Sequence, residues 1–391
     1  MIEMIILKKM ILNDGTEYVF RFPLDPNVDY RLPENRKYLA LSWVEANSLT
    51  TEHNQQLRLM DWALEQKYSG DMLMESKLWL AFLWGCCYNL VSPWVILNKF
   101  PLPPYSDQEY ADFSDWYNET FDKHRFDTDC RYRKAQMLAC VKSYLETVNG
   151  SQSDKVFSLM KLDDPKERFG RTWEWSMGIA FFGRLSAWNH LEAIDLVTGW
   201  KYDFDAPSYY LEDLSGSESN RNGVCFLFNR EDLLTKHGRL KNGNGKPSAE
   251  DCDVLSDLIE DFTKVVQYEL DDITPLTRFN LETLVCCWYK KKFRLKSTRY
   301  LGWDAERTFD EMEYVREIWP EVSIEPLKAA RDHFLPKFWN KERGVQKNKM
   351  PVFFSTGRPE DIIRFQDSCD WVLEGTQATP KKVVSTAKRL W

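Results

Sequence analysis

A polar segment between residues 213 and 225 holds the side chains with the clearest potential for chemistry. It reads Asp-Leu-Ser-Gly-Ser-Glu-Ser-Asn-Arg-Asn-Gly-Val-Cys. Backbone amides beside its glycines, together with the hydroxyls of Ser217 and Ser219, are suited to hold a phosphate, and Arg221 adds a guanidinium that can bind it with two hydrogen bonds. We therefore predict an anion-binding loop. The alternative is a polar turn capped by its own side chains.

Cys225 ends this segment and has two interpretations. A thiolate activated by Arg221 or by a helix start would be a nucleophile. The neighbours Val224 and Phe226 to Phe228 instead favour a buried apolar cysteine, which is the commoner state of a thiol outside a disulfide.

A second candidate is Glu282, inside the apolar stretch 278–290. A lone carboxylate is costly to bury unless it is paired, so burial would raise its pKa and make it a base. The alternative is an ion pair with Arg278, four residues earlier on a half-exposed helix.

A third group is Arg184, Trp188 and Glu192, which are spaced four residues apart. On a helix they lie on one stripe, with the charged residues on either side of the tryptophan. We expect a structural cation–π and ion-pair stripe, with the wall of a substrate site as the alternative.

The charge of the chain is unevenly distributed. The net charge is −8 over 391 residues, but residues 286–391 carry +6 and the first 285 carry −14. The densest basic run spans 290–299, and we consider it either a solvated helix end or a DNA-facing surface. Its cations are Lys290, Lys291, Lys292, Arg294, Lys296 and Arg299.

Composition excludes several classes of protein. The nine cysteines include no Cys-x-x-Cys pair, and the five histidines have no metal-helix spacing. A Walker A motif, a signal peptide and an apolar run of membrane-spanning length are also absent from the sequence. We expect reduced thiols, no metal or cofactor, no membrane partner and a cytoplasmic location.

The periodicity predicts a mainly α fold. Asn13-Asp14-Gly15 between two apolar runs predicts a small β-hairpin within residues 1–30, and residues 31–391 would form one large helical domain. Capping boxes at Ser106–Glu109 and Thr308–Glu311 predict helix starts. Expected helices cover 131–148, 171–182, 184–197, 248–268, 276–291, 307–318 and 325–334.

With these blocks in view, the chain resembles the bacteriophage amino acid:DNA transferases that build hypermodified thymidines. The matching blocks are Phe182 to Glu192, Asp213 to Cys225, and Phe279 to Thr283 with Arg299 to Asp304. They lie in a motif-bearing core of about 165–310. One departure is Asn220, where the family pattern leads us to expect a histidine, and this weakens any role for a histidine base.

The resemblance implies an amino acid, glycine in the better-known pathways, that displaces phosphate from 5-phosphomethyl-uracil in double-stranded phage DNA in the host cytoplasm. It implies catalytic roles for Cys225, Glu282 and Asp213. The amino acid's carboxylate would bind Arg184, while the base would leave the duplex to stack on Trp188 or Trp303. The implied substrate contacts are Arg184, Trp188, Ser217, Ser219, Arg221, Asn222, Tyr300 and Trp303, and the implied DNA contacts are the six cations of 290–299.

Two other functions remain open. One is a phage enzyme similar to glutamyl/putrescinyl-thymine pyrophosphorylase, which would use an amine such as putrescine. The other is a non-catalytic helical DNA-binding protein, whose binding would weaken with salt and leave the base unchanged.

Overall fold

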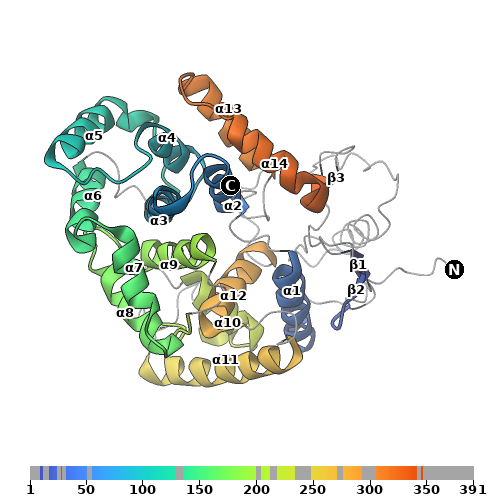
Figure 1. Ribbon diagram of the computed structural model, residues 1–391. Helices are drawn as coiled ribbons and strands as arrows, with labels where there is room; N and C mark the ends of the chain where they lie inside the picture. The colour runs from blue at the N-terminus through green and yellow to red at the C-terminus, as the bar shows by residue number, and fades with distance from the viewer. Residues whose placement is uncertain are drawn as a thin grey trace.

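A computed structural model shows a mainly α-helical protein, as predicted (Figure 1). It describes residues 9–11, 17–23, 28, 32–50, 55–127, 135–199, 204–211, 218–233, 248–270, 276–292, 305–340 and 345–346.

The helices and strands follow one another along the chain with short connections between most neighbours, and η denotes a short 3-10 helix. The first half contains β1 (Lys9–Ile11), β2 (Glu17–Val19), η1 (Pro33–Asn35), α1 (Arg36–Thr50), α2 (Gln55–Glu65), α3 (Gly70–Cys87), α4 (Val91–Lys99), α5 (Asp107–Thr120), η2 (Phe121–Lys123), α6 (Ala135–Val148), α7 (Gln152–Met160) and α8 (Pro165–Met177). The second half contains α9 (Arg184–Thr198), α10 (Glu218–Leu227), η4 (Glu231–Leu233), α11 (Ala249–Leu270), α12 (Arg278–Lys292), α13 (Ala305–Ile318), α14 (Glu325–Phe338), β3 (Trp339–Asn340) and β4 (Val345–Gln346).

The predicted N-terminal hairpin is confirmed. β1 and β2 pair antiparallel with Lys9 opposite Val19. The buried carboxylate of Glu45 on α1 accepts hydrogen bonds from the Tyr18 hydroxyl at 2.7 Å and from the backbone N–H of Arg21 at 2.7 Å. Hydrogen bonds to this carboxylate therefore connect the end of the hairpin to α1.

Side-chain caps at Ser106, Ser151 and Asp164 mark the starts of α5, α7 and α8. The capping box of Ser106 is present at the start of α5. The second predicted box is wrong, because α13 begins at Ala305 and the side chain of Thr308 is buried, accepting a hydrogen bond from Gln56. The expected helix 171–182 instead spans Pro165–Met177, because Asp164 caps its start and proline is favourable in the first turn.

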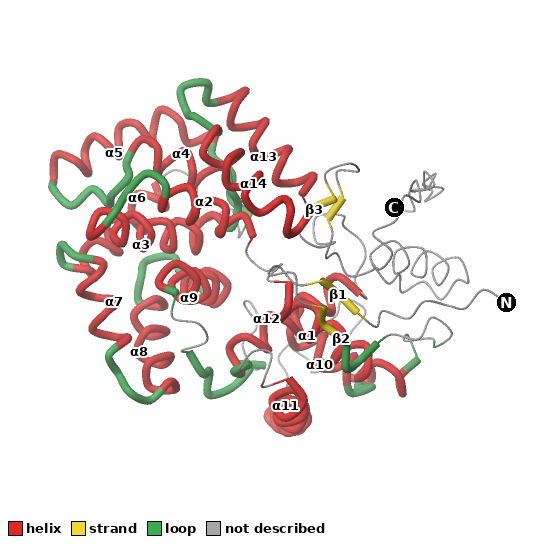
Figure 2. Tube along the Cα trace, turned by 45° about the vertical axis from the view of Figure 1, so that its right-hand side comes forward, coloured by secondary structure: helices red, strands yellow, loops and turns green. Residues whose placement is uncertain are grey.

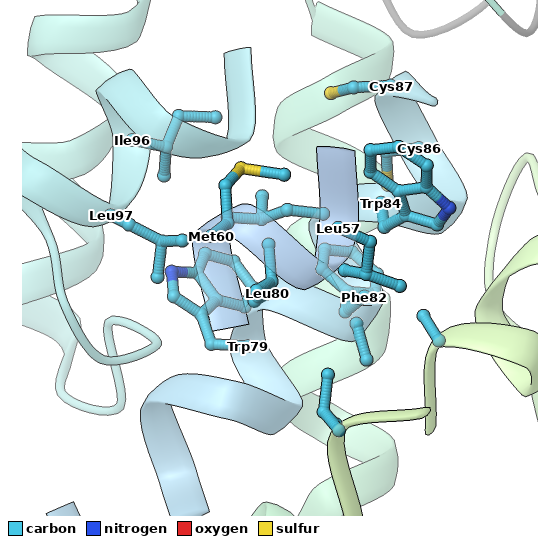
Figure 3. Close-up of a cluster of buried hydrophobic side chains, with 14 of the residues drawn as sticks. Leu57, Met60, Trp79, Leu80, Phe82, Trp84, Cys86, Cys87, Ile96 and Leu97 are labelled. Atoms are coloured by element: carbon cyan, nitrogen blue, oxygen red, sulfur yellow. The ribbon is translucent and has the colours of Figure 1, made fainter. Parts of the chain in front are cut away.

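The larger of two hydrophobic clusters surrounds α3, whose residues from Ser76 to Cys87 are all buried (Figure 3). Trp79, Leu80 and Phe82 pack there against side chains from α2 and α4. Helix α9 lies close against α3 at Gly85, where an added Cβ would be 3.0 Å from the Cβ of His190. This cluster therefore fixes the position of α9.

The second cluster is formed by α1, α10, α11 and α12, with Phe20, Tyr209 and Leu211. Figures 1 and 2 show α9 between α8 and α12, and an ion pair between Arg184 and Glu282 joins α9 to α12. Within the described residues, no helix is both long and apolar enough to cross a membrane. The division into a hairpin element and one helical domain stays a prediction.

Candidate active site

The second half of the predicted anion-binding loop is a helix, so the loop prediction is wrong for residues 218–225. These residues belong to α10, and the side chains of Asn220, Arg221 and Asn222 are each only 1% exposed. The physical reason is the apolar run that follows, because Val224, Cys225 and Leu227 pack into the second cluster and hold α10 against α12.

A buried ion pair joins α9 to α12. The guanidinium Nη2 of Arg184 lies 2.6 Å from Oε1 of Glu282, and both side chains are buried. The predicted alternative, in which Arg278 pairs with Glu282, is wrong. Arg278 instead donates to Glu260 at 2.6 Å and lies 3.3 Å from Asp205. The carboxylate expected to be lone is thus neutralised by a residue from another sequence block.

Aromatic rings cover the same guanidinium. Its Cζ lies 4.8 Å from the ring centre of Trp188 and 5.3 Å from that of Tyr210, which confirms the predicted cation–π contact. Trp188 Nε1 donates to the hydroxyl of Thr283 at 3.0 Å, and this hydroxyl donates to the carboxylate of Glu192. The predicted stripe therefore binds α12 through hydrogen bonds.

The backbone carbonyl of Tyr209 connects these helices to α10. It accepts hydrogen bonds from Arg184 Nη2 and from Asn220 Nδ2, both at 3.2 Å. The side chain of Tyr209 is held in turn, because its hydroxyl lies 2.7 Å from that of Thr263 on α11. Burial raises the pKa of Tyr209, so its phenol stays protonated.

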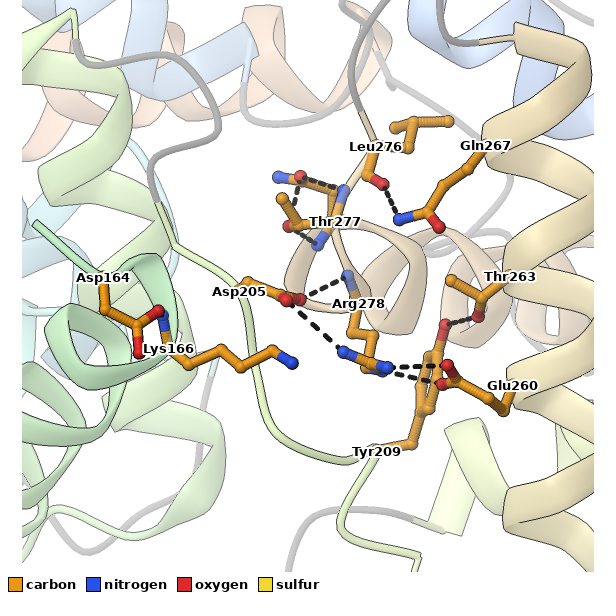
Figure 4. Close-up of polar contacts among 11 residues, drawn as sticks. Asp164, Lys166, Asp205, Tyr209, Glu260, Thr263, Gln267, Leu276, Thr277 and Arg278 are labelled. Atoms are coloured by element: carbon orange, nitrogen blue, oxygen red, sulfur yellow. Dashed lines mark hydrogen bonds and ion pairs between the residues drawn. The ribbon is translucent and has the colours of Figure 1, made fainter.

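Figure 4 shows how the segment 204–211 is fixed between α11 and α12. Arg278, at the start of α12, binds Asp205 on this segment and forms a two-bond pair with Glu260 on α11. Hydrogen bonds from Arg278 lower the pKa of Glu260. These contacts set the position of the Tyr209 carbonyl, which is where Arg184 and Asn220 meet.

Two buried polar atoms at this junction lack a partner among the described residues. They are Nη1 of Arg184, a donor, and Oδ1 of Asn220, an acceptor. Buried polar atoms are nearly always hydrogen-bonded, so each such exception needs a specific explanation.

Arg221 and Cys225 are buried, whereas a phosphate-binding loop would present their side chains at the surface. Arg221 Nη1 donates to the carbonyl of Leu211 at 3.1 Å, and Cys225 is fully buried in the second cluster. Asn222 is also buried, and its Oδ1 has no partner in the part of the chain that the structure describes. The proposed roles of these three residues remain predictions.

Several predicted site residues lie outside the described residues. They are Asp213, Ser217, Arg294, Lys296, Arg299, Tyr300 and Trp303. Ser219 belongs to α10, and Lys290, Lys291 and Lys292 form the last turn of α12, but nothing is described of their side chains.

Sequence reasoning missed two contributors to this junction. Thr283 follows the chosen Glu282 directly, and its hydroxyl was not recognised as the link to Trp188 and Glu192. Tyr209 contributes its backbone carbonyl, which no side-chain pattern reveals. Among the described residues, no group of three or more His, Cys, Asp or Glu side chains is placed to hold a metal ion.

Comparison with known proteins agrees with the resemblance seen in the sequence. The family described as amino acid:DNA transferase matches residues 51–297. A protein named serinyltransferase from Salmonella phage ViI is 50% identical over 363 residues, which cover 90% of this chain and 88% of that protein. No solved structure matches. This chain therefore belongs to the amino acid:DNA transferase family.

Proposed function

We propose that this enzyme attaches serine through its amine to a modified uracil in DNA, displacing a phosphate from the base's 5-phosphomethyl group. The observation that carries the proposal is the buried pair of Arg184 and Glu282, which joins two separated sequence blocks, with Asn220 of a third block bound to the same Tyr209 carbonyl as Arg184. A base and a binder of carboxylates are thereby held side by side, as the joining of an amino acid to an electrophile requires.

Serine replaces glycine as the preferred amino acid in this proposal. The support is the serinyltransferase of phage ViI, since half of its residues are identical across nearly the whole chain. Transfer to DNA places the enzyme where phage DNA is found, in the host cytoplasm.

The proposed step is a substitution at the methylene carbon. The amine of serine first loses a proton, for which the Glu282 carboxylate is the proposed acceptor. The nitrogen then forms a bond to the methylene carbon, and the carbon–oxygen bond to phosphate breaks, with phosphate leaving as the anion. Ser217, Ser219 and Arg221 stay proposed donors to this phosphate, and the cations of 290–299 stay proposed contacts of the DNA backbone.

The test is to incubate the full chain with a duplex containing 5-phosphomethyl-uracil and an equimolar mixture of serine, glycine and putrescine. Mass spectrometry of the digested nucleosides should show the serine adduct and release of phosphate. A duplex with 5-hydroxymethyl-uracil is the control, because its hydroxyl is a poor leaving group and no adduct should form. A putrescine adduct would support the pyrophosphorylase-like alternative, and salt-sensitive binding with an unchanged base would support the non-catalytic one.

A further inference from the structure

The unpartnered donor of Arg184 and the unpartnered acceptor of Asn220 are hard to explain as parts of the fold alone. Arg184 is 2% exposed, and its Nη2 serves both Glu282 and the Tyr209 carbonyl, while Nη1 has no partner among the described residues. A buried cationic N–H without an acceptor is destabilising. The fold alone would be expected to supply one.

The identity of the orphan atom on Asn220 follows from its other contact. Its amide group faces the Tyr209 carbonyl oxygen at 3.2 Å, and a carbonyl oxygen can only accept. The atom at that contact must therefore be the nitrogen, which makes the second atom, Oδ1, the acceptor without a partner.

Both orphan atoms lie at the junction formed by the Tyr209 carbonyl. Each belongs to the same planar group as a nitrogen that binds the one carbonyl oxygen of Tyr209. A donor and an acceptor are thus presented beside a single anchor point, next to the carboxylate of Glu282.

We propose that Arg184 Nη1 and Asn220 Oδ1 form the binding site for the α-carboxylate and the α-amine of the amino acid substrate. The inference rests on the proposed function and adds the atoms that recognise its substrate. A carboxylate supplies the acceptor that Nη1 lacks, and an amine supplies the donor that Oδ1 lacks.

The pairing of one donor with one acceptor discriminates between possible occupants. A phosphate dianion offers only acceptors, so it would satisfy Arg184 and be repelled by Asn220 Oδ1. An amino acid carries both groups on one carbon and has no net charge, which matches the neutral pair of Arg184 and Glu282. Glu282, the proposed proton acceptor, is paired with the same Arg184 that would hold the carboxylate.

The test measures binding ratios by calorimetry, with the full chain saturated with the unreactive 5-hydroxymethyl-uracil duplex. The ligands are L-serine, L-serinamide, which lacks the carboxylate, and 3-hydroxypropanoate, which lacks the amine. Wild-type protein should bind serine about 10-fold or more tightly than either analogue, the loss expected for one hydrogen bond to a charged group.

Two variants separate the contacts. In Arg184→Lys, the single ammonium cannot bind Glu282 and the substrate carboxylate at the same time as a guanidinium can. The affinity for serine should therefore be within about 2-fold of the affinity for serinamide. In Asn220→Ala, the affinity for serine should likewise fall to within about 2-fold of the affinity for 3-hydroxypropanoate. Both ratios compare ligands on one protein sample, so a smaller folded fraction leaves them unchanged.

Asn189→Ala is the matched control, because Asn189 is buried on the same helix as Arg184 and its Nδ2 also lacks a partner among the described residues. Both ratios should stay at their wild-type values. If only water bridges the two atoms, Arg184→Lys and Asn220→Ala should keep the wild-type affinity ratios, and this result would overturn the site. The absence of any serine binding would overturn it as well. If serine is then still transferred to DNA, the proposed function stands. Binding with the expected ratios but no DNA modification supports the site and contradicts the function.

Discussion

Nη2 of Arg184 lies 2.6 Å from Oε1 of Glu282, although the two residues are 98 positions apart in the chain. The pair connects α9, which belongs to the first hydrophobic cluster, with α12, which lies mostly in the second. Rings of Trp188 and Tyr210 cover the guanidinium and limit the access of water to it. A charge pair in this position serves both the joining of the two clusters and the proposed chemistry.

Removing one member of this pair should destabilise the fold strongly. In Glu282→Leu the buried cation of Arg184 keeps the Tyr209 carbonyl but loses its counter-charge, and the free energy of unfolding should fall by about 3–5 kcal/mol. Urea unfolding followed by circular dichroism measures the change. Glu282→Gln retains an acceptor oxygen and should lose less.

The double variant Arg184→Met/Glu282→Leu separates stability from activity. It buries no unpaired charge, so it should recover most of the stability lost in Glu282→Leu while transferring no amino acid to DNA. A double variant as unstable as the single one, or one that still modifies DNA, would contradict this account.

How far the sequence predicts this site depends on which interactions are local. The cation–π contact of Arg184 with Trp188 follows from helical spacing and is present, whereas the ion pair of Arg184 is formed with Glu282 on α12. The partner of Glu282 did not follow, because a local rule favours Arg278 while the tertiary fold supplies Arg184. The helix α10 was missed because serine, asparagine and glycine favour turns, whereas packing of the apolar run after Asn222 decides the outcome.

Thr283 should be more important than its size suggests. Its hydroxyl accepts from Trp188 and donates to Glu192, so Thr283→Val leaves a donor and a carboxylate without this partner. We expect a loss of about 1–3 kcal/mol in the free energy of unfolding, measured by urea denaturation. Thr283→Ser keeps the hydroxyl and is the control. Equal losses in both variants would show that the methyl group, rather than the hydroxyl, matters here.

The close contact of α3 with α9 requires a glycine at position 85. An added Cβ would lie 3.0 Å from both His190 Cβ and the Ser186 carbonyl oxygen. Gly85→Ala should therefore cost about 1–3 kcal/mol of stability. At Gly170 on α8 a Cβ would meet no atom within 4 Å, so Gly170→Ala should stabilise the protein by about 0.5–1 kcal/mol. Thermal unfolding of both variants checks the opposite signs, and the same sign in both would refute the packing explanation.

The burial of Cys225 bears on whether its thiol acts as the predicted nucleophile. Its side chain is fully buried among apolar neighbours, so a thiolate there is disfavoured. We expect Cys225→Ala to retain transfer activity within about threefold of wild type, which corresponds to less than 1 kcal/mol of transition-state free energy. The measurement is the initial rate of adduct formation. A loss of about 100-fold or more, with a wild-type circular dichroism spectrum, would instead support the nucleophilic role of the thiol.

His190 makes a separate prediction about pH. Burial among Phe82, Tyr144 and Trp175 lowers its pKa from 6.5 to about 3, and its Nδ1 lies 2.8 Å from the Ser176 hydroxyl. Between these two pKa values the unfolded chain binds a proton that the folded chain does not, so stability is complete above pH 6.5 and decreases as the pH falls toward 3.

The variant His190→Phe isolates this contribution, because other titrating groups, including His124 with its similarly lowered pKa, are present in both proteins. Between pH 7 and about pH 4.5, wild type should lose about 2.5 kcal/mol more unfolding free energy than the variant, since each pH unit below the unfolded pKa contributes about 1.4 kcal/mol. Urea unfolding at both pH values gives this difference directly. If wild type and His190→Phe lose stability equally, folding does not shift the pKa of His190, and the burial of a neutral imidazole is contradicted. Because His190 lies on α9 against Gly85, the same protonation would also weaken the helix that carries Arg184.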